Sequence, residues 1–357
     1  MCSSDLVVDG IVDDSCDVSR GLIVVGDHDR RDEVDAIDVL AQSMGWPVIG
    51  EPSGGAQGAA TALAHGPLVC ESAAFSTQCV PDLVVTVGRV GLHRAVNRVI
   101  DSARLHVAVD SKPLWSDPNR SANVIVAQVP RPGAASPDPS WLSSWRRADD
   151  VVATTVSSML DSDAGSPSGM AIARSVAAAV PSGGQLFLGS SSAVRHVSSF
   201  AGRLSGIRVL GNRGTAGIDG CVSTAWGVAL GAREASGGPT VALVGDQAFW
   251  YDSNAWAVAR DEARPDLTVV VADNDGAGIF SQLEQGGQAF EAHFERVFGL
   301  PLAVDVARIV DAFQGRVHSA SSISDLERTL EAIVGDGVHA VVVKAKARVD
   351  EAAQLSK

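Results

Sequence analysis

Two apolar runs, each followed by a polar residue, constrain the fold of this chain more than any other feature. Residues 240–245 and 267–272 are mostly small and β-branched apolar side chains, as in strands buried on both faces of a sheet. Asp246 follows the first run, and Asn274 follows the second about one crossover connection later. Both polar groups are therefore expected at the carboxyl ends of parallel strands, where open α/β sheets bind ligands.

The rest of the chain repeats this alternation of apolar runs and helix-like stretches. Such an alternation predicts parallel sheets with helices on both faces. The expected fold class is therefore α/β, with two doubly wound parallel-sheet domains. The predicted strands are residues 21–26, 46–49, 83–88, 105–110 and 123–127 in the first half, and 185–188, 207–210, 240–245, 267–272 and 339–343 in the second.

A stretch rich in proline, serine and alanine separates the two sets of strands. It covers residues 129–150, and its composition is typical of a linker. Residues 1–20 are acidic and lack periodicity, so we interpret them as the remnant of a linker. We therefore predict one domain at 21–128 and a second at 151–357.

Composition excludes several classes of partner. The 357 residues carry a formal net charge of −14, which argues against nucleic acid and anionic membrane surfaces. No apolar run approaches the roughly 18 residues that a spanning helix needs. The five scattered cysteines have no Cys-x-x-Cys spacing, and the acidic N-terminus does not read as a signal peptide. These features favour reduced thiols and a cytoplasmic location.

Asp246 and Asn274 could together hold a metal ion. A carboxylate and an amide offer hard oxygen ligands, which suit Mg²⁺ shared with a diphosphate. The N–H groups that begin a helix after Asp246 would also favour an anion there. Taken alone, the pair is equally compatible with two ordinary loops, one of them capped by Asp246.

Three further motifs surround this pair. They are Gly-Trp-Pro-Val-Ile-Gly-Glu-Pro-Ser at 45–53, Asn-Arg-Gly-Thr-Ala-Gly-Ile-Asp-Gly at 212–220 and Asp-Asn-Asp-Gly-Ala-Gly-Ile-Phe-Ser-Gln-Leu-Glu-Gln at 273–285. With Gly245-Asp246-Gln247, they resemble the 2-succinyl-5-enolpyruvyl-6-hydroxy-3-cyclohexene-1-carboxylate synthases, the thiamine diphosphate enzymes of menaquinone biosynthesis. The resemblance runs from about residue 21 to the C-terminus. It covers the family's central and diphosphate-binding domains, and the N-terminal pyrimidine-binding domain has no counterpart here.

The resemblance implies a cofactor and a metal site. Mg²⁺ or Mn²⁺ would be held by Asp246, Asn274 and the carbonyl of Gly276. Ile218 would support a bent cofactor, although a core isoleucine at a helix start is nearly as good an interpretation. Thiamine diphosphate would be bound by Gly217, Ile218, Gly245, Asp246, Gln247 and Asn274.

The family's substrates, 2-oxoglutarate and isochorismate, are both dicarboxylates. Arginine forks bind carboxylates in a bidentate manner, although surface pairing with acidic neighbours would also explain two arginines. Ordinary core packing would equally explain the apolar members of the implied site. The substrate-binding residues implied by the resemblance are Ser191, Arg195, Arg213, Ile279, Phe280, Leu283 and, from the central domain, Arg94.

The implied activity is decarboxylation of 2-oxoglutarate and addition of the succinyl carbanion equivalent to isochorismate. Two alternatives stay open: another thiamine-dependent 2-oxo-acid enzyme of the acetolactate synthase type, and a non-catalytic cofactor-binding fragment or subunit. In the family, an activating glutamate comes from the N-terminal domain of a neighbouring subunit, and no glutamate here matches it. We therefore expect a homodimer, a homotetramer or a separate pyrimidine-binding chain, and no turnover of 2-oxoglutarate by residues 1–357 alone.

The sequence departs from the family pattern at a few positions. Gln247 replaces the usual glycine of the Gly-Asp-Gly motif, and Trp250-Tyr251 replaces the usual Leu-His. Ala277 also replaces a glycine, and a side chain there would hinder the backbone if the loop required a positive φ.

Overall fold

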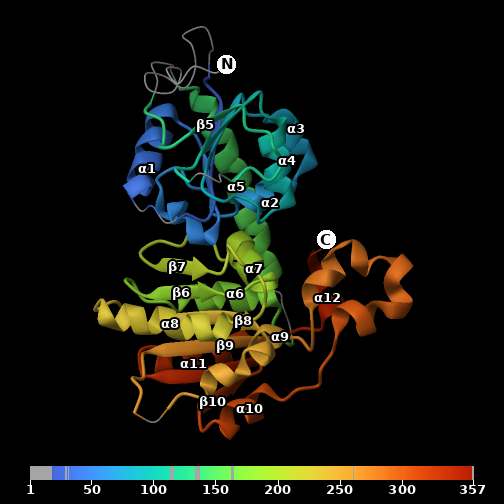
Figure 1. The fold of residues 1–357 in the computed structure, drawn as a ribbon. Helices are drawn as coiled ribbons and strands as arrows, with labels where there is room; N and C mark the ends of the chain where they lie inside the picture. Colours follow the sequence, from blue (N-terminus) through green and yellow to red (C-terminus); the bar gives the residue numbers. More distant parts are fainter. Residues whose placement is uncertain are drawn as a thin grey trace. The chain divides into compact units, whose positions relative to one another are not determined.

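The computed structural model describes residues 18–355, apart from 29, 31, 113–115, 133–136, 162–164 and 260. The chain divides into two compact units, each built around one sheet (Figure 1). The first unit comprises the residues up to Ser157 together with Gly202–Ser205, and the second comprises Ser158–Ala201 and the residues from Gly206 onward. Most of the predicted linker remnant at 1–20 lies outside the described residues.

The first unit contains a parallel five-stranded sheet in the order β2-β1-β3-β4-β5. Its strands are β1 (Gly21–Val25), β2 (Val48–Gly50), β3 (Leu83–Val87), β4 (Leu105–Val109) and β5 (Val124–Val126). Its helices are α1 (Asp32–Met44), α2 (Gly66–Glu71), α3 (Ala73–Gln78), α4 (Arg94–Ser102) and α5 (Pro139–Asp161), with short 3-10 turns at Pro52–Gly54 and Ala56–Gly58.

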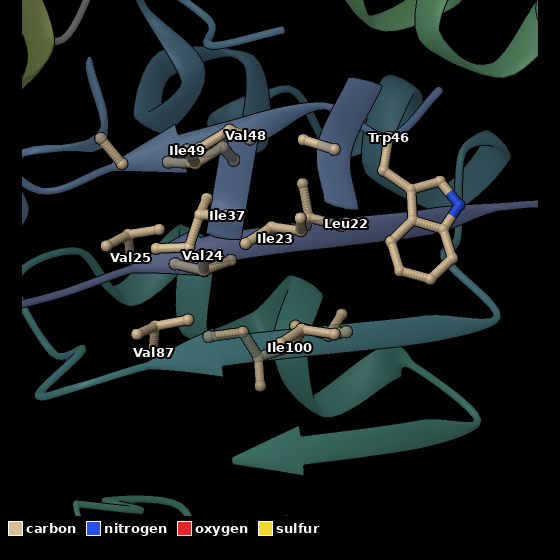
Figure 2. Packing of buried hydrophobic residues seen from close by; sticks show 14 of the residues in the cluster. Leu22, Ile23, Val24, Val25, Ile37, Trp46, Val48, Ile49, Val87 and Ile100 are labelled. Atoms are coloured by element: carbon tan, nitrogen blue, oxygen red, sulfur yellow. The ribbon is translucent and has the colours of Figure 1, made fainter. Parts of the chain in front are cut away.

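The core of this unit is made of branched aliphatic side chains from both faces of the sheet. Figure 2 shows side chains of β1 packing with those of α1, β2, β3 and α4. β1 and β3 are buried along their whole lengths, as central strands of a parallel sheet covered on both faces should be. Helix α5 adds two tryptophans, and Trp141 Nε1 donates to the carbonyl oxygen of Gly21 at 2.6 Å.

The second unit contains a parallel six-stranded sheet in the order β10-β11-β9-β8-β6-β7. Its strands are β6 (Gln185–Leu188), β7 (Arg208–Gly211), β8 (Thr240–Gly245), β9 (Leu267–Asp273), β10 (Arg316–Ala320) and β11 (Val338–Lys344). Its helices are α6 (Gly169–Ala178), α7 (Ser192–Phe200), α8 (Cys221–Glu234), α9 (Asp246–Tyr251), α10 (Val306–Ala312), α11 (Ile323–Ile333) and α12 (Arg348–Leu355). Between β9 and α10 the chain forms short turns at Gly278–Gln282, Glu284–Gly286, Gln288–His293 and Glu295–Gly299.

Helices cover both faces of this second sheet. Side chains of α8, α9 and α10 pack in one core cluster with Ala242, Val244, Val269 and Val271 of the central strands. Helices α6 and α7 contact each other and lie against β8 from the other side, and α11 contacts α6, β10 and β11 (Figure 1). The chain is therefore α/β with two doubly wound parallel sheets, and the predicted fold class is confirmed.

Two local differences from the sequence prediction have clear physical causes. Residues 139–150 of the predicted linker are helical, since Pro139 occupies the first position of α5, where proline needs no N–H partner. Strand β10 was not predicted, because its residues are partly exposed and carry little apolar patterning. The domain limits themselves stay a prediction. Over the described part of the chain, no helix is both long and apolar enough to cross a membrane.

Candidate functional site

The second unit holds a cavity of about 470 Å³ at the carboxyl end of its sheet. Its walls are the loops that follow β6, β7, β8, β9 and β11, five neighbouring strands. Strands β6 and β8 lie side by side, yet the helices that follow them, α7 and α9, cover opposite faces of the sheet. This is a topological switch point, where doubly wound sheets form their binding crevice.

The cavity brings together residues that lie far apart in the sequence. Arg94 is the exception among the predicted site residues, since it begins α4 in the other unit and is not among the described residues lining the cavity. Its role stays a prediction. The predicted residues that do line the cavity are Ser191, Arg195, Arg213, Gly217, Ile218, Gly245, Asp246, Gln247, Asn274, Gly276, Ile279, Phe280 and Leu283.

Asp246 begins α9, and backbone N–H groups hold its carboxylate in place. Oδ1 accepts from Gln247 N at 2.8 Å, and Oδ2 accepts from Gly276 N at 2.7 Å. Burial raises the pKa of this carboxyl to about 6, and the charges of Asp273 and Asp275 add to the shift. A cation beside Asp246 would offset both effects, because it favours the ionised carboxylate.

The loop after β9 carries the other two predicted metal ligands. It turns sharply, with positive φ at Asp275 (58°) and at Gly276 (132°). Any side chain at Gly276 would clash with the carbonyl oxygen of Gly299, so this position requires glycine. Ala277 has φ −82°, and the replacement of glycine there therefore costs the loop no strain.

The donor set at this loop is chemically suited to Mg²⁺, although it has few charged members. Among the described residues, no group of three His, Cys, Asp or Glu side chains could hold a metal. The predicted set uses one carboxylate from Asp246, one amide oxygen from Asn274 and one backbone carbonyl from Gly276. Mg²⁺ typically binds through one or two carboxylates and completes its shell with phosphate and water oxygens.

The wall after β6 contains a strained serine and an arginine bonded to it. Ser191 has φ 73° and ψ −129°, a combination that residues other than glycine rarely adopt. Arg195, one turn into α7, donates from Nη1 to the carbonyl oxygen of Ser191 at 2.8 Å. The strained turn thus fixes where the guanidinium of Arg195 enters the cavity.

Arg213 follows β7 and differs from Arg195 in its partners. Its side chain is half-buried, and none of the described residues accepts a hydrogen bond from its guanidinium. A partly desolvated guanidinium without an acceptor favours an anionic ligand, since the fork geometry suits a carboxylate or a phosphate.

Apolar side chains form another part of the cavity wall. Ile279, Phe280 and Leu283 come from the turn after the β9 loop, and Phe280 packs against Phe298 with ring centroids 5.6 Å apart. Ile218 lines the cavity and also packs against the core beneath α8. Both the predicted site role and the alternative of core packing therefore fit Ile218.

Gln247 occupies the position where the motif usually has glycine, and its side chain makes a specific contact. It is buried, and its Nε2 donates to the carbonyl oxygen of Leu300 at 2.9 Å. Ala277 N donates to the neighbouring carbonyl of Gly299 at 2.8 Å. Gln247 therefore ties α9 to the segment at 299–300, which in turn supports the β9 loop.

Sequence reasoning missed several residues of the cavity wall, including three at or within helices. Gly169, His196 and Glu351 all line the cavity, and they come from α6, α7 and α12. His196 follows Arg195 directly, but consecutive residues of a helix do not share a face, so this position gave no signal. Gly169 and Glu351 belong to no motif, and only the fold brings them together.

Comparison with known proteins matches residues 199–344 to the family "Thiamine pyrophosphate enzyme, C-terminal TPP binding domain". Three relatives carry the name 2-succinyl-5-enolpyruvyl-6-hydroxy-3-cyclohexene-1-carboxylate synthase. The protein from Thermobifida fusca is 38% identical over 92% of this chain and 57% of its own length. Those from Kineococcus radiotolerans and Nocardioides sp. are 40% and 33% identical, over 84% and 95% of this chain and 53% and 63% of their own lengths.

The matched family binds its cofactor in its C-terminal domain, and the match includes the loops after β7, β8 and β9 that form the cavity. The chain spans a little over half the length of the curated relatives it matches. This chain is therefore a homologue of the 2-succinyl-5-enolpyruvyl-6-hydroxy-3-cyclohexene-1-carboxylate synthases over about half of their length, and it includes a thiamine pyrophosphate binding domain.

Proposed function

We propose that the cavity binds thiamine diphosphate with a divalent cation, and that the protein uses it to decarboxylate 2-oxoglutarate and to add the resulting succinyl unit to isochorismate. The observation that carries this proposal is the convergence of Asp246, Asn274, Arg195 and Arg213 on one cavity of about 470 Å³. Its size falls within the range of ordinary cofactor sites.

The residues present fit the diphosphate and its cation. A side chain added at Gly245 would meet no described atom within 4 Å, so the backbone there faces open cavity. Asp246, Asn274 and the carbonyl of Gly276 would hold Mg²⁺ or Mn²⁺. Each Asp246 oxygen accepts one N–H group, which leaves a lone pair on each oxygen for the metal.

Two arginines would bind the carboxylates of the substrate. When bound, thiamine diphosphate supplies an electron sink for loss of CO₂ from a 2-oxo acid. The protein's task is then to orient the substrate, and we assign it to Arg195 and Arg213; the hydrogen bond from Arg195 to Ser191 and the position of both arginines at the cavity support this. Ile279, Phe280 and Leu283 would exclude water from the same space.

The acetolactate synthase type of enzyme is the main alternative, and the arginines argue against it. Its substrate, pyruvate, carries one carboxylate, whereas 2-oxoglutarate carries two. Binding of 2-oxoglutarate, but not of pyruvate, to the protein would support the proposal. We also propose that the protein is cytoplasmic. A pyrimidine-binding domain would complete its site.

The experiment that tests the proposal is calorimetric titration of the chain with thiamine diphosphate, with and without Mg²⁺. We expect Mg²⁺-dependent binding, and we expect Asp246→Ala to weaken it at least about 100-fold, since even outer-sphere partners of a metal contribute 10- to 100-fold. Asp261→Ala removes an exposed acidic side chain elsewhere and is the matched control. Equal affinity for Asp246→Ala and the parent would exclude Asp246 as the metal ligand.

A further inference from the structure

Helix α12 (Arg348–Leu355) lies beyond the residues matched to the thiamine pyrophosphate binding domain, which end at 344. Two of its charged side chains, Arg348 and Glu351, are three positions apart and therefore share one face of the helix. Glu351 is buried and the Arg348 side chain is only 10% exposed, in contrast to the exposed Asp350 between them. Charged side chains that are largely withdrawn from solvent on a short helix need a structural reason.

Arg348 packs against the loop that carries the proposed metal ligands. Its Nη2 donates to Glu295 Oε2 at 2.8 Å, and its side chain is 10% exposed. Three glycines leave room for it: a methyl group added at Gly276 or Gly278 would lie 3.3 or 3.4 Å from its Cζ or Cγ, and one at Gly299 would clash with Nη1. Arg348 therefore fills the space between the β9 loop and the segment around Gly299.

Glu351 contacts the other side of the cavity. Its Oε2 accepts from Gly169 N at the start of α6, and its Oε1 lies 3.6 Å from His196 Nε2. Glu351 and His196 are 3% and 5% exposed, and both line the cavity together with Gly169. Burial keeps the His196 pKa below its ordinary value, although the charge of Glu351 opposes that shift.

The chain that leads into α12 is fixed to the same two regions. Ala345 lines the cavity, and its N–H donates to the carbonyl oxygen of Asp273 at 2.8 Å. Lys346 N donates to the carbonyl oxygen of Pro167 at 2.8 Å. Backbone and side chains of 345–351 thus connect the end of β9 with the start of α6.

We propose that α12 closes the cavity, with Arg348 and Glu351 as positioning residues that hold its two walls at a fixed separation. Arg348 supports the β9 loop by packing against Gly276 and Gly278. Glu351 holds the start of α6 and the side chain of His196. Neither residue needs to touch a ligand. The expected effect of these residues on cofactor binding rests on the proposed function, whereas the fixing of the two walls does not.

The direct test is hydrogen–deuterium exchange, followed by mass spectrometry, on the full chain without ligand. Arg348→Met should speed the exchange of the Gly276, Ala277 and Leu300 amides at least about tenfold, because the loop loses its support, and Glu351→Met should do the same for the start of α6, because Gly169 N loses its acceptor. Asp350→Asn removes one charge from the same helix at an exposed position and should change neither region.

A second measurement separates positioning from general stability. Both variants should raise the dissociation constant of Mg²⁺–thiamine diphosphate about tenfold, and Arg348→Lys should recover part of the loss, since it restores a cation beside Glu295. Parent-like exchange at both walls would overturn the proposal, as would an equal increase throughout the sheet, including β10. If the parent binds no thiamine diphosphate, the proposed function fails, while the exchange pattern still decides the role of α12.

Discussion

The Nη1 atom of Arg195 donates to the carbonyl oxygen of Ser191 at 2.8 Å, and Ser191 is held at φ 73° and ψ −129°. The conformation of one residue therefore determines where the guanidinium of the other lies. Strained backbone of this kind persists only where the surrounding structure imposes it, and it concentrates at binding sites.

Ser191→Gly should stabilise the protein. Glycine removes a strain of about 1–3 kcal/mol and costs about 0.5–1 kcal/mol in backbone entropy, so the free energy of unfolding should rise by roughly 1 kcal/mol. Urea denaturation of the parent and the variant measures this difference. Ser191→Ala is the control, because alanine keeps the strain; equal stability of Ser191→Gly and Ser191→Ala would show that φ at this position is not strained.

The contact between Gln247 and Leu300 should depend on a donated hydrogen bond. Gln247→Met keeps the shape but leaves the Leu300 carbonyl without this donor, at an expected cost of about 1–3 kcal/mol. Gln247→Glu should cost more, because an ionised carboxylate cannot donate and would face a carbonyl oxygen while buried. Chemical denaturation at neutral pH gives both values, and a smaller loss for the glutamate than for the methionine would show that stability does not depend on donation from Gln247 to Leu300.

Arg213 should contribute to substrate affinity but not to cofactor affinity. Arg213→Gln should weaken 2-oxoglutarate binding by about 2 kcal/mol, roughly 30-fold, since it removes a partly buried charge partner. Calorimetry in the presence of Mg²⁺ and thiamine diphosphate checks this, with Arg308→Gln at an exposed position as the control. Unchanged substrate affinity would make Arg213 a structural residue only.

Buried histidines should make the protein sensitive to mild acid. Burial lowers the pKa of His106 and of His196 from the ordinary value of 6.5. Above 6.5 both are neutral in the folded and unfolded states; below it, the unfolded state takes up protons first, so stability falls as pH falls from 6.5 towards the lowered pKa.

This pH effect can be measured by urea unfolding at about pH 7.5 and about pH 5.5, since one unit of pKa difference corresponds to about 1.4 kcal/mol. Replacing His106 by Gln should reduce the difference between the two pH values. His106 Nε2 and Nδ1 lie 2.8 and 2.9 Å from the hydroxyl oxygens of Thr86 and Ser121, which glutamine can also contact. A pH dependence identical to that of the parent would count against a shifted pKa at His106.

Much of the fold was predictable because local patterns and global packing agree. The valine-rich runs that form β8 and β9 are buried in the centre of the sheet. Their composition was therefore sufficient to predict them as strands. Edge strand β10 is exposed on several residues and lacks such a pattern. The proline-rich composition around Pro139 favoured a linker, whereas in the structure Pro139 is the first residue of helix α5.

The site was predictable only where residues belong to continuous motifs. Asp246 and Asn274 lie directly after strands, and Gly276 is in the same loop as Asn274, so sheet topology places the three together. Glu351 accepts a hydrogen bond from Gly169 N, 182 positions away in the sequence. No periodicity or motif predicts such a contact. The role of Gln247 as a donor to Leu300 was likewise hidden, because it depends on how the segment between β9 and α10 folds back.

The separation of Gly169 from Glu351 has a consequence for biosynthesis. At a translation rate of about 5–20 residues per second, roughly 10–35 seconds pass between the addition of the one residue and of the other, since they are 182 positions apart. During that interval the start of α6 and the wall formed by α7 have no carboxylate to hold them. A nascent chain can therefore complete most of its second sheet on the ribosome, but this part of the cavity forms only after Glu351 has emerged.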